Sequence, residues 1–217
     1  MLRFAEEIIL LLLGDEDGRF AHTRSWTLDY ALAGAVLMDL AMEDRIDTDL
    51  ENLILLDATP LSDDLLDPTL RDISAGGQQD IRYWVEHTAQ RAAEIREEAL
   101  NRLVGRGILE RRDDRHLWVF RSRRYPAVDG TAEREVKLRI MSILFSNEIP
   151  SPRDVMIIAL AEACGIFSDL LSRQELERAA PRIEQVRRLD LIGQAMTRAI
   201  LDIELSVAAS VQARMYY

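Results

Sequence analysis

The stretch SWTLDYALAGAVLMDLAMED, residues 25–44, is apolar on most sides when it is wound into a helix. Ser25 is a residue type that favours the N-cap position, so we expect the helix to begin near it. A helix that is apolar all round is buried among other elements. We therefore predict that this helix is central and that the other segments pack around it.

Most of the other segments also have their apolar residues at helical spacing. Residues 2–13 place Leu2, Ala5, Ile8, Ile9 and Leu12 on one face, before GDEDG breaks the run. Further helices are expected over 79–105 with its end at Gly105 or Gly107, from Thr131, from Ser151 with Pro152, from Ser172 with Glu175, and from Leu189 onward. Residues 45–48 and 53–56 flank a polar turn and predict a small hairpin. The expected fold is mostly α: a single globular domain of packed helices with small β-hairpins, covering residues 1–217.

The composition is that of a folded protein, with 48% apolar and 30% charged residues. The single cysteine, Cys164, has apolar neighbours and is expected to be a buried core residue, which suits a reducing compartment. The apolar run at residues 8–13 is far shorter than the roughly 20 residues of a membrane-spanning helix, and its flanks do not resemble a signal peptide. We expect a cytoplasmic protein that associates with membranes only peripherally, if at all.

Charge is distributed unevenly along the chain, whose formal net charge is −11. Residues 1–80 contain 18 acidic residues and 5 arginines, a net charge of −13, whereas residues 81–217 have a net charge of +2. An anionic partner is therefore expected to contact the second part of the chain.

Sequence signatures of catalysis are scarce. The three histidines, His22, His87 and His116, are far apart and have no second ligand at metal-binding spacing. Residues 15–18, DEDG, lack the alternating oxygens and the distant glutamate of a calcium loop. The chain also has no phosphate-binding glycine loop and no GxSxG motif. The sequence thus predicts no catalytic site, no metal and no cofactor.

A basic and aromatic stretch, GILERRDDRHLWVFRSRRYP at residues 107–126, is the strongest local signal. We predict a hairpin with strands at 108–112 and 116–121 around a turn at 113–115. Alternation then puts Leu117 and Val119 on one face and Trp118 and Phe120 on the other. The candidate contact residues for a membrane or a partner are Leu117, Trp118, Phe120, Arg121, Arg123 and Arg124.

Four interpretations of this hairpin follow from its residues. It could cover the core while its arginines are simply solvated. It could enter a lipid head-group layer, where aromatic residues insert and arginines meet phosphates. It could form an oligomer interface, since such interfaces favour Trp, Phe and Arg. It also has the form of the wing of a winged-helix DNA-binding protein, but the net charge and the lack of a basic recognition helix argue against nucleic acid.

Three segments occur in an order that identifies a family. EEIILLLLGDEDG (6–18), WTLDYALAGAVLMDLAMEDRI (26–46) and IREEALNRLVGRGIL (95–109), followed by an aromatic hairpin, resemble the Golgi phosphoprotein 3 family over residues 2–205. The resemblance implies one mostly helical domain that is not an enzyme. It further implies a eukaryotic-type role: binding phosphatidylinositol 4-phosphate, inserting a hydrophobic hairpin into the membrane, and acting as an adaptor for cargo proteins.

The resemblance also implies a head-group site, of which this chain retains a part. Trp26 and Arg96 match the family's residues, whereas Ala35 and Ala93 stand where the family has arginines. Arg24 and Arg91 are further candidates because they are close in sequence. The expected site is a reduced pocket for a lipid head group or another phosphate or sulfate. If both alanines lie at its rim, Ala35→Arg with Ala93→Arg should increase the affinity for phosphatidylinositol 4-phosphate.

Overall fold

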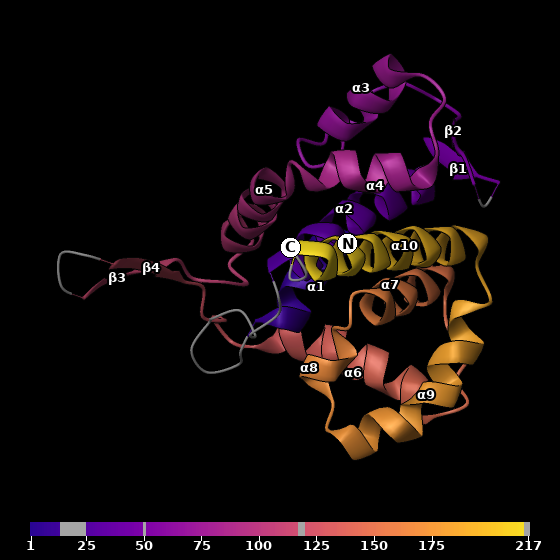
Figure 1. Ribbon diagram of the computed structural model, residues 1–217. Helices are drawn as coiled ribbons and strands as arrows, with labels where there is room; N and C mark the ends of the chain where they lie inside the picture. The colour runs from indigo at the N-terminus through magenta and orange to yellow at the C-terminus, as the bar shows by residue number, and fades with distance from the viewer. Residues whose placement is uncertain (14–24, 50, 117–119, 215–217) are drawn as a thin grey trace.

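The computed structural model describes residues 1–13, 25–49, 51–116 and 120–214, and these form the helices and strands of Figure 1. The helices are α1 (Phe4–Leu12), α2 (Ser25–Met42), α3 (Asp67–Gly76), α4 (Ile81–Ala89), α5 (Ala92–Gly105), α6 (Thr131–Phe145), α7 (Pro152–Ala163), α8 (Phe167–Leu170), α9 (Arg173–Arg187) and α10 (Leu191–Arg214). The strands are β1 (Ile46–Thr48), β2 (Leu53–Leu55), β3 (Arg112–His116) and β4 (Phe120–Arg124), which form two antiparallel pairs, β1–β2 and β3–β4. The mostly α fold predicted from the sequence is confirmed.

Helix α2 lies at the centre of the molecule, as its apolar composition predicts. It packs against α1, α4, α5, α7 and α10, and residues on all of its sides, such as Leu32, Val36 and Leu37, are fully buried. A Cβ at Gly34 would lie 2.7 Å from the Leu160 side chain of α7. The missing side chain at Gly34 therefore allows α2 and α7 to approach closely.

Helix α1 buries its predicted apolar face, which includes Ala5, Ile8, Ile9 and Leu12, and it is buried on its other sides as well. It packs against α2, α5, α6, α7 and α8, and its carboxylates Glu6 and Glu7 are at most 2% exposed. Glu7 accepts hydrogen bonds from Arg139 of α6 (2.7 Å) and Arg153 of α7 (3.3 Å). Because arginines on neighbouring helices pair with it, a charged residue can occupy the core side of α1.

The helix expected over 79–105 is in fact two helices, α4 and α5, which meet at Gln90 and Arg91. The Gln90 N–H donates to the His87 carbonyl (3.2 Å) and the Arg91 N–H to the Thr88 carbonyl (3.0 Å), which tightens the turn. The bend lets α4 pack on α2 and α10 while α5 packs on α1 and α2. Neither glycine nor proline marks this break, so the sequence pattern does not reveal it. The predicted end at Gly105 is confirmed.

Helix α2 begins at Ser25 as expected, and of the caps predicted for α6, α7 and α9 those of α7 and α9 are confirmed. Ser151 and Ser172 cap α7 and α9, each in a capping box. At α6 the N-cap is Gly130, with φ of 66°, and not Thr131. Asp129 accepts a hydrogen bond from the Thr131 N–H (2.9 Å) and takes the role expected of threonine. The short helix α8 was not predicted.

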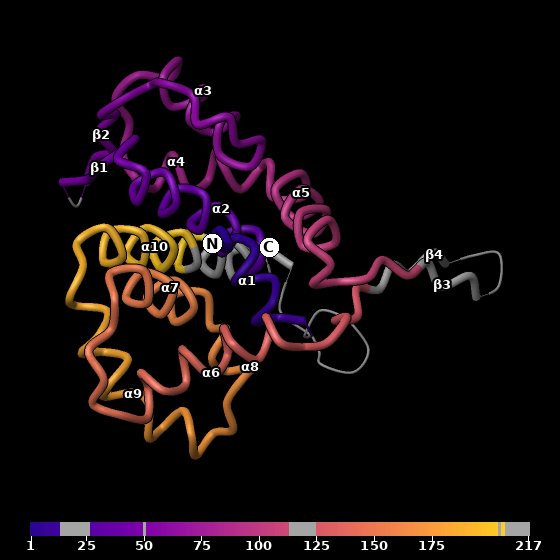
Figure 2. Tube along the Cα trace, turned by 180° about the vertical axis from the view of Figure 1, so that it is seen from behind, coloured from indigo at the N-terminus to yellow at the C-terminus, as the bar shows by residue number. Residues whose placement is uncertain are grey.

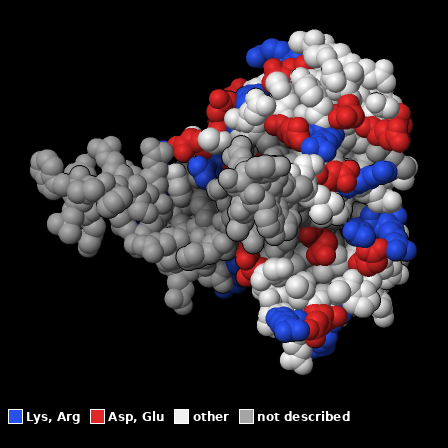
Figure 3. Space-filling model, in the orientation of Figure 1, with Lys and Arg blue, Asp and Glu red and all other residues white. Residues whose placement is uncertain are grey.

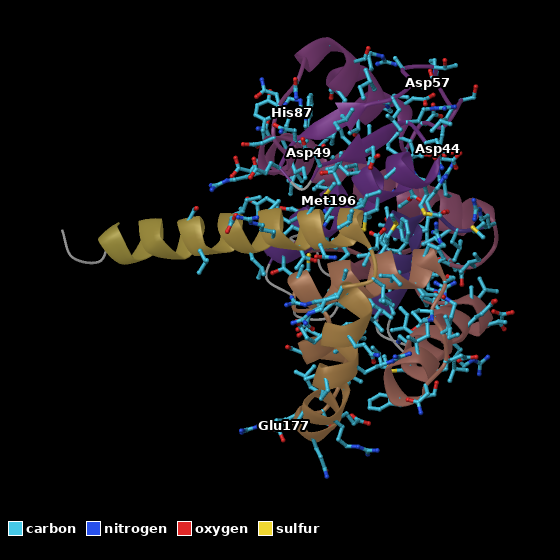
Figure 4. All side chains as sticks on the ribbon, turned by 90° about the vertical axis from the view of Figure 1, so that its right-hand side faces the viewer. Asp44, Asp49, Asp57, His87, Glu177 and Met196 are labelled. Atoms are coloured by element: carbon cyan, nitrogen blue, oxygen red, sulfur yellow. The ribbon has the colours of Figure 1, made fainter. Side chains whose placement is uncertain are left out.

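The terminal helix α10 and the small hairpin β1–β2 agree with the predictions. Met196, Ala199, Ile200 and Ile203 of α10 are buried, and the helix packs on α7 and α4. The C-terminal part of α10 extends beyond the neighbouring helices in Figure 4. Within the described ranges, no helix has both the length and the apolarity needed to cross a membrane.

Candidate functional site

The basic hairpin is formed by β3 and β4, and its strands lie about four residues later than predicted. Arg112 pairs with Arg124, Arg115 with Arg121, and His116 with Phe120. The expected turn at 113–115 was therefore wrong, because these residues belong to β3. Polar residues such as Asp113 and Asp114 suggested a turn, yet the chain reverses between His116 and Phe120.

The hairpin projects from the helical body. It extends away from α5 and α6 in Figure 1, where no helix of the described chain packs across its strands, and Figure 2 shows from behind how the chain leaves the helical body after α5. Its base is fixed: Leu109 and Tyr125 are buried, and the Glu110 N–H donates to the Pro126 carbonyl (2.9 Å). Arg111 also pairs with Glu97 of α5 (3.3 Å). A firm base thus carries two strands that are not part of the core.

The structure places only part of the predicted hairpin contact set. Leu117 and Trp118 lie outside the described residues. Phe120, Arg121, Arg123 and Arg124 all belong to β4, at positions given by the strand pairing. Paired positions share a face of an antiparallel ribbon, so positions 115, 121 and 123 lie on one face together with position 113. Three of these four positions are arginine.

Arg96 is exposed on α5 and lies near the N-terminal end of α2. The charge of Arg96 acts there on Asp29, one helical turn from Ser25: burial raises the pKa of the Asp29 carboxyl, and the charge of Arg96 partly offsets this. The packing of α2 on α5 thus brings Arg96 to the end of α2 that contains Trp26. The Trp26 side chain and all of Arg24 lie outside the described residues. Asp29 was not among the predicted site residues, because a lone aspartate on a helix resembles a solvated residue.

The two alanines of the expected site lie in different surroundings. Ala35 is fully buried in the core, so it cannot lie at the rim of a pocket, and that prediction is wrong. Ala93 is exposed and lines a groove of about 500 Å³ along α5, together with Arg91 and the acidic residues Asp64, Glu94, Glu97 and Glu98. Arg91 is engaged by Glu94 (3.1 Å) and Asp72 (3.6 Å). The groove beside Ala93 is therefore predominantly acidic.

Comparison with known protein families identifies the family of this chain. The sequence profile of the family described as Golgi phosphoprotein 3 (GPP34) matches residues 4–203. The chain belongs to the Golgi phosphoprotein 3 family. No curated protein matches the chain significantly. The match covers every helix from α1 to α9 and half of α10, and it includes the projecting hairpin.

The Golgi phosphoprotein 3 resemblance implies a head-group site with arginines at two positions that are alanine in this chain. Of these two alanines, Ala35 is buried in the core and Ala93 lies in an acidic groove. Arg96 is the retained cation that the structure describes, and the carboxyl of Asp29 lies within range of its charge. The described parts of the expected site therefore carry little net positive charge. The positive charge of the second part of the chain is instead concentrated in the hairpin stretch, residues 107–126, which contains six arginines.

A second charged cluster, at the start of α1, was not predicted. Asp39 of α2 is fully buried, and its carboxylate accepts a hydrogen bond from the Phe4 N–H (2.7 Å) and lies 3.4 Å from Arg153. Burial raises the pKa of Asp39 to about 7, although Arg153 and the Phe4 N–H act in the opposite direction. The Arg153 guanidinium also lies 3.9 Å above the Phe4 ring. Charged residues inside the runs EEIILLLL and LMDLAM are the sequence signal that could have revealed this cluster.

The cysteine and the described histidines, which were considered as catalytic or metal-binding groups, lie in surroundings typical of structural residues. Cys164 is buried at the end of α7, as predicted. His87 stacks on Tyr83, with its Nε2 3.8 Å from Asp72, His116 is in β3, and His22 lies outside the described residues. In the described part of the chain, no three His, Cys, Asp or Glu residues are grouped so that they could hold a metal ion.

Proposed function

We propose that the protein is a non-enzymatic, peripheral membrane-binding adaptor whose basic hairpin contacts anionic lipid head groups. The observation that carries this proposal is the projection of β3 and β4 from the body on a fixed base. The hairpin stretch, residues 107–126, contains six arginines, and the apolar residues Leu117, Trp118 and Val119 connect its two strands. A membrane can contact such a hairpin without meeting the rest of the molecule.

Electrostatics permits this contact although the protein is acidic. At an ionic strength near 0.15 M the Debye length is about 8 Å, so acidic residues on the distant side of the body are largely screened. Each arginine near an anionic surface contributes about 1 kcal/mol. Several arginines acting together outweigh the weak repulsion that remains, and insertion of apolar residues between the lipids adds to the attraction.

The surroundings of the two alanines favour recognition of negative charge over recognition of one head group. A selective pocket for a phosphorylated inositol needs several cations that converge on its phosphates. Here Ala35 is in the core, the groove at Ala93 is acidic, and the charge of Arg96 is partly offset by the nearby Asp29. We therefore expect binding to follow the charge density of the membrane, with little preference for phosphatidylinositol 4-phosphate.

Co-sedimentation with vesicles tests the proposal. The protein should sediment with phosphatidylcholine vesicles that contain phosphatidylserine, and equally with vesicles in which phosphatidylinositol 4-phosphate supplies the same charge. It should stay in the supernatant with phosphatidylcholine alone. Replacing Arg121, Arg123 and Arg124 by alanine should remove sedimentation. A control with the exposed arginines Arg134, Arg173 and Arg188 replaced by alanine should behave as the wild type. Equal recovery in the supernatant for all vesicles would exclude lipid binding.

A protein-interaction role for the same hairpin is the second candidate. It is favoured by the two-strand ladder, whose outer edges are not paired with other described strands. Such edges and the aromatic residues of the hairpin suit a homo-oligomer or a cargo protein. Light scattering of the wild type and of a variant with Trp118→Ala and Phe120→Ala separates the candidates, because only an oligomer loses mass when the hairpin is changed.

A further inference from the structure

The outer edge of β2, at the opposite end of the molecule from β3–β4, is an incomplete strand-pairing site. Ile46 pairs with Leu55 and Thr48 with Leu53 in the β1–β2 ladder. The Asp49 N–H donates to the Asn52 carbonyl (3.3 Å), and the Leu56 N–H donates to the Arg45 carbonyl (2.8 Å).

These bonds fix the direction of the backbone groups of β2. Hydrogen-bonded pairs alternate along an antiparallel ladder, so the Asp47–Ile54 pair between them is hydrogen-bonded as well. Leu53 and Leu55 therefore direct their N–H and C=O groups away from β1. The outer edge of β2 is defined by these groups.

Part of this edge is paired with the chain itself. The Leu53 N–H donates to the Gln79 carbonyl (3.2 Å), and the Ile81 N–H donates to the Glu51 carbonyl (3.0 Å). Residues 79–81 run antiparallel to β2, so Leu55 lies on the side from which the chain arrives after α3. The N–H and C=O of Leu55 have no hydrogen-bond partner among the described residues. The third strand formed by residues 79–81 therefore pairs only with the first part of β2 and leaves Leu55 open.

An apolar groove runs along the same edge. It has a volume of about 410 Å³ and lies between β2 and the C-terminal end of α3, where it is lined by Leu53, Ile54, Leu55, Ile73, Ser74, Gly77 and Gln78. Ile54 and Leu55 are 40% and 37% exposed, and nothing lies within 4 Å of a Cβ placed on Gly77. An open backbone edge beside an apolar groove is complementary to an extended peptide, which offers both hydrogen bonds and alternating side chains.

Acidic residues surround this edge. Exposed Asp44, Asp47, Asp49, Glu51 and Asp80 belong to the hairpin or to the segment paired with it, and Asp57 follows β2. Figure 3 shows acidic side chains gathered over the end of the molecule that contains β1 and β2, and Figure 4 labels Asp44, Asp49 and Asp57 there. The described cation among them, Arg45, is paired with Asp57 (2.9 Å). This charge favours a basic partner and opposes edge-to-edge pairing of two copies.

We propose that the outer edge of β2 and its groove bind an extended, basic segment of another protein by strand addition. The segment pairs with the backbone of Leu55 and places apolar side chains in the groove, beside the exposed side chains of Ile54 and Leu55. Its basic residues face the acidic rim. This site is separate from the β3–β4 hairpin, so it does not depend on lipid binding.

Fluorescence anisotropy with a labelled peptide of alternating valine and lysine tests the site. The full chain should bind this peptide, and a peptide of alternating valine and glutamate should not bind. Leu55→Pro removes the outward N–H without removing a bond to β1, since proline is tolerated at an open edge. It should weaken binding about tenfold, the effect of one lost backbone hydrogen bond.

Two controls make the test specific. Leu55→Val keeps the N–H and should bind the peptide as the wild type does, and circular dichroism should show that both variants are folded. Hydrogen exchange of the Leu55 amide should slow when the lysine peptide is added. Equal peptide affinity of Leu55→Pro and wild type would overturn strand addition and leave only charge attraction. The proposal would likewise be overturned if the peptide-free protein were a dimer and Leu55→Pro made it a monomer, because the edge would then bind a second copy.

Discussion

Several arginines surround the start of α1, and several others lie in the β3–β4 hairpin. The two groups differ in the charges that lie next to them. Arg153 and Arg139 at the α1 junction lie beside carboxylates that are almost completely buried, and each forms ion pairs with more than one element. In the hairpin, Arg112 is opposite Arg124 and Arg115 is opposite Arg121. Directly opposed like charges destabilise a two-stranded ladder.

The difference separates structural charge from charge that is available to a partner. Both members of a buried ion pair are needed for stability, because removal of one member leaves an uncompensated charge in the core. In the hairpin, Arg112 pairs with the exposed Glu110 (2.7 Å), and an exposed pair contributes much less to stability than a buried one. An anionic partner, as proposed for the hairpin, would offset the repulsion between its opposed arginines.

The largest effect is expected from comparing Ala35→Arg with Ala93→Arg. Ala35→Arg places a long cation in a fully buried position, and we expect a loss of more than about 4 kcal/mol of unfolding free energy. Ala93→Arg changes an exposed position and should alter stability by less than about 0.5 kcal/mol. Urea denaturation measures both values.

This pair of variants also revises the design that the sequence suggested. The double change expected to create a phosphatidylinositol 4-phosphate pocket is incompatible with the core, so Ala93→Arg should be tested alone. A folded, soluble Ala35→Arg variant of wild-type stability would show that α2 packs differently from the arrangement described above.

The next effect is a pH dependence that originates at Asp39. Its pKa is about 7 in the folded protein and 3.8 without the fold, so the folded state holds the proton more tightly. A raised pKa of this kind means that the stabilising contribution is complete below pH 4 and is lost as the pH rises towards 7. At about 1.4 kcal/mol for each pKa unit, the loss is at most about 4 kcal/mol.

Asp39→Asn isolates this contribution from those of other carboxylates. The pKa of Asp63, for example, is lowered by Arg102 and the Leu65 N–H, so Asp63 adds stability as the pH rises from the acidic range. We therefore expect the unfolding free energy of the wild type, minus that of Asp39→Asn, to fall between pH 4 and pH 7. A difference that is constant over this range would mean that Asp39 is already ionised at pH 4.

Much of the fold could be predicted because it depends on local patterns. The apolar surround of residues 25–44 predicted the central helix, and the serine caps at Ser151 and Ser172 predicted the starts of α7 and α9. The break at Gln90 could not be predicted, because it results from how α4 and α5 pack on different helices. Nor could the strand boundaries of β3–β4, since charged residues such as Asp113 and Asp114 are equally common in turns and in exposed strands.

The candidate site was harder to predict for a related reason. A sequence match assigned Ala35 to a pocket, although the apolar surround of residues 25–44 already indicated that this position is buried, as the structure shows. Arg96 and its neighbourhood at the end of α2 could be expected from the resemblance, whereas its partner Asp29 could not. Spacing along a helix identifies faces, but it does not show which face is covered.

The smallest effect on stability is expected from removing one like-charge pair from the hairpin. Arg115→Thr with Arg121→Thr replaces two directly opposed arginines by a pair that suits a strand, and it should stabilise the ladder by about 0.2 to 1 kcal/mol. Hydrogen exchange of the β3 and β4 amides should slow accordingly. Binding to phosphatidylserine vesicles should weaken by more than about tenfold, since two arginines near the surface contribute about 1 kcal/mol each.

The matched control is Arg173→Thr with Arg188→Thr, two exposed arginines on or next to α9, and it should leave vesicle binding unchanged. Opposite signs for ladder stability and membrane affinity are the result that distinguishes a partner-binding role from a structural one. If the double hairpin variant instead loses ladder stability and keeps its membrane affinity, the arginines of this ribbon are structural like those around α1, and the contrast between the two regions disappears.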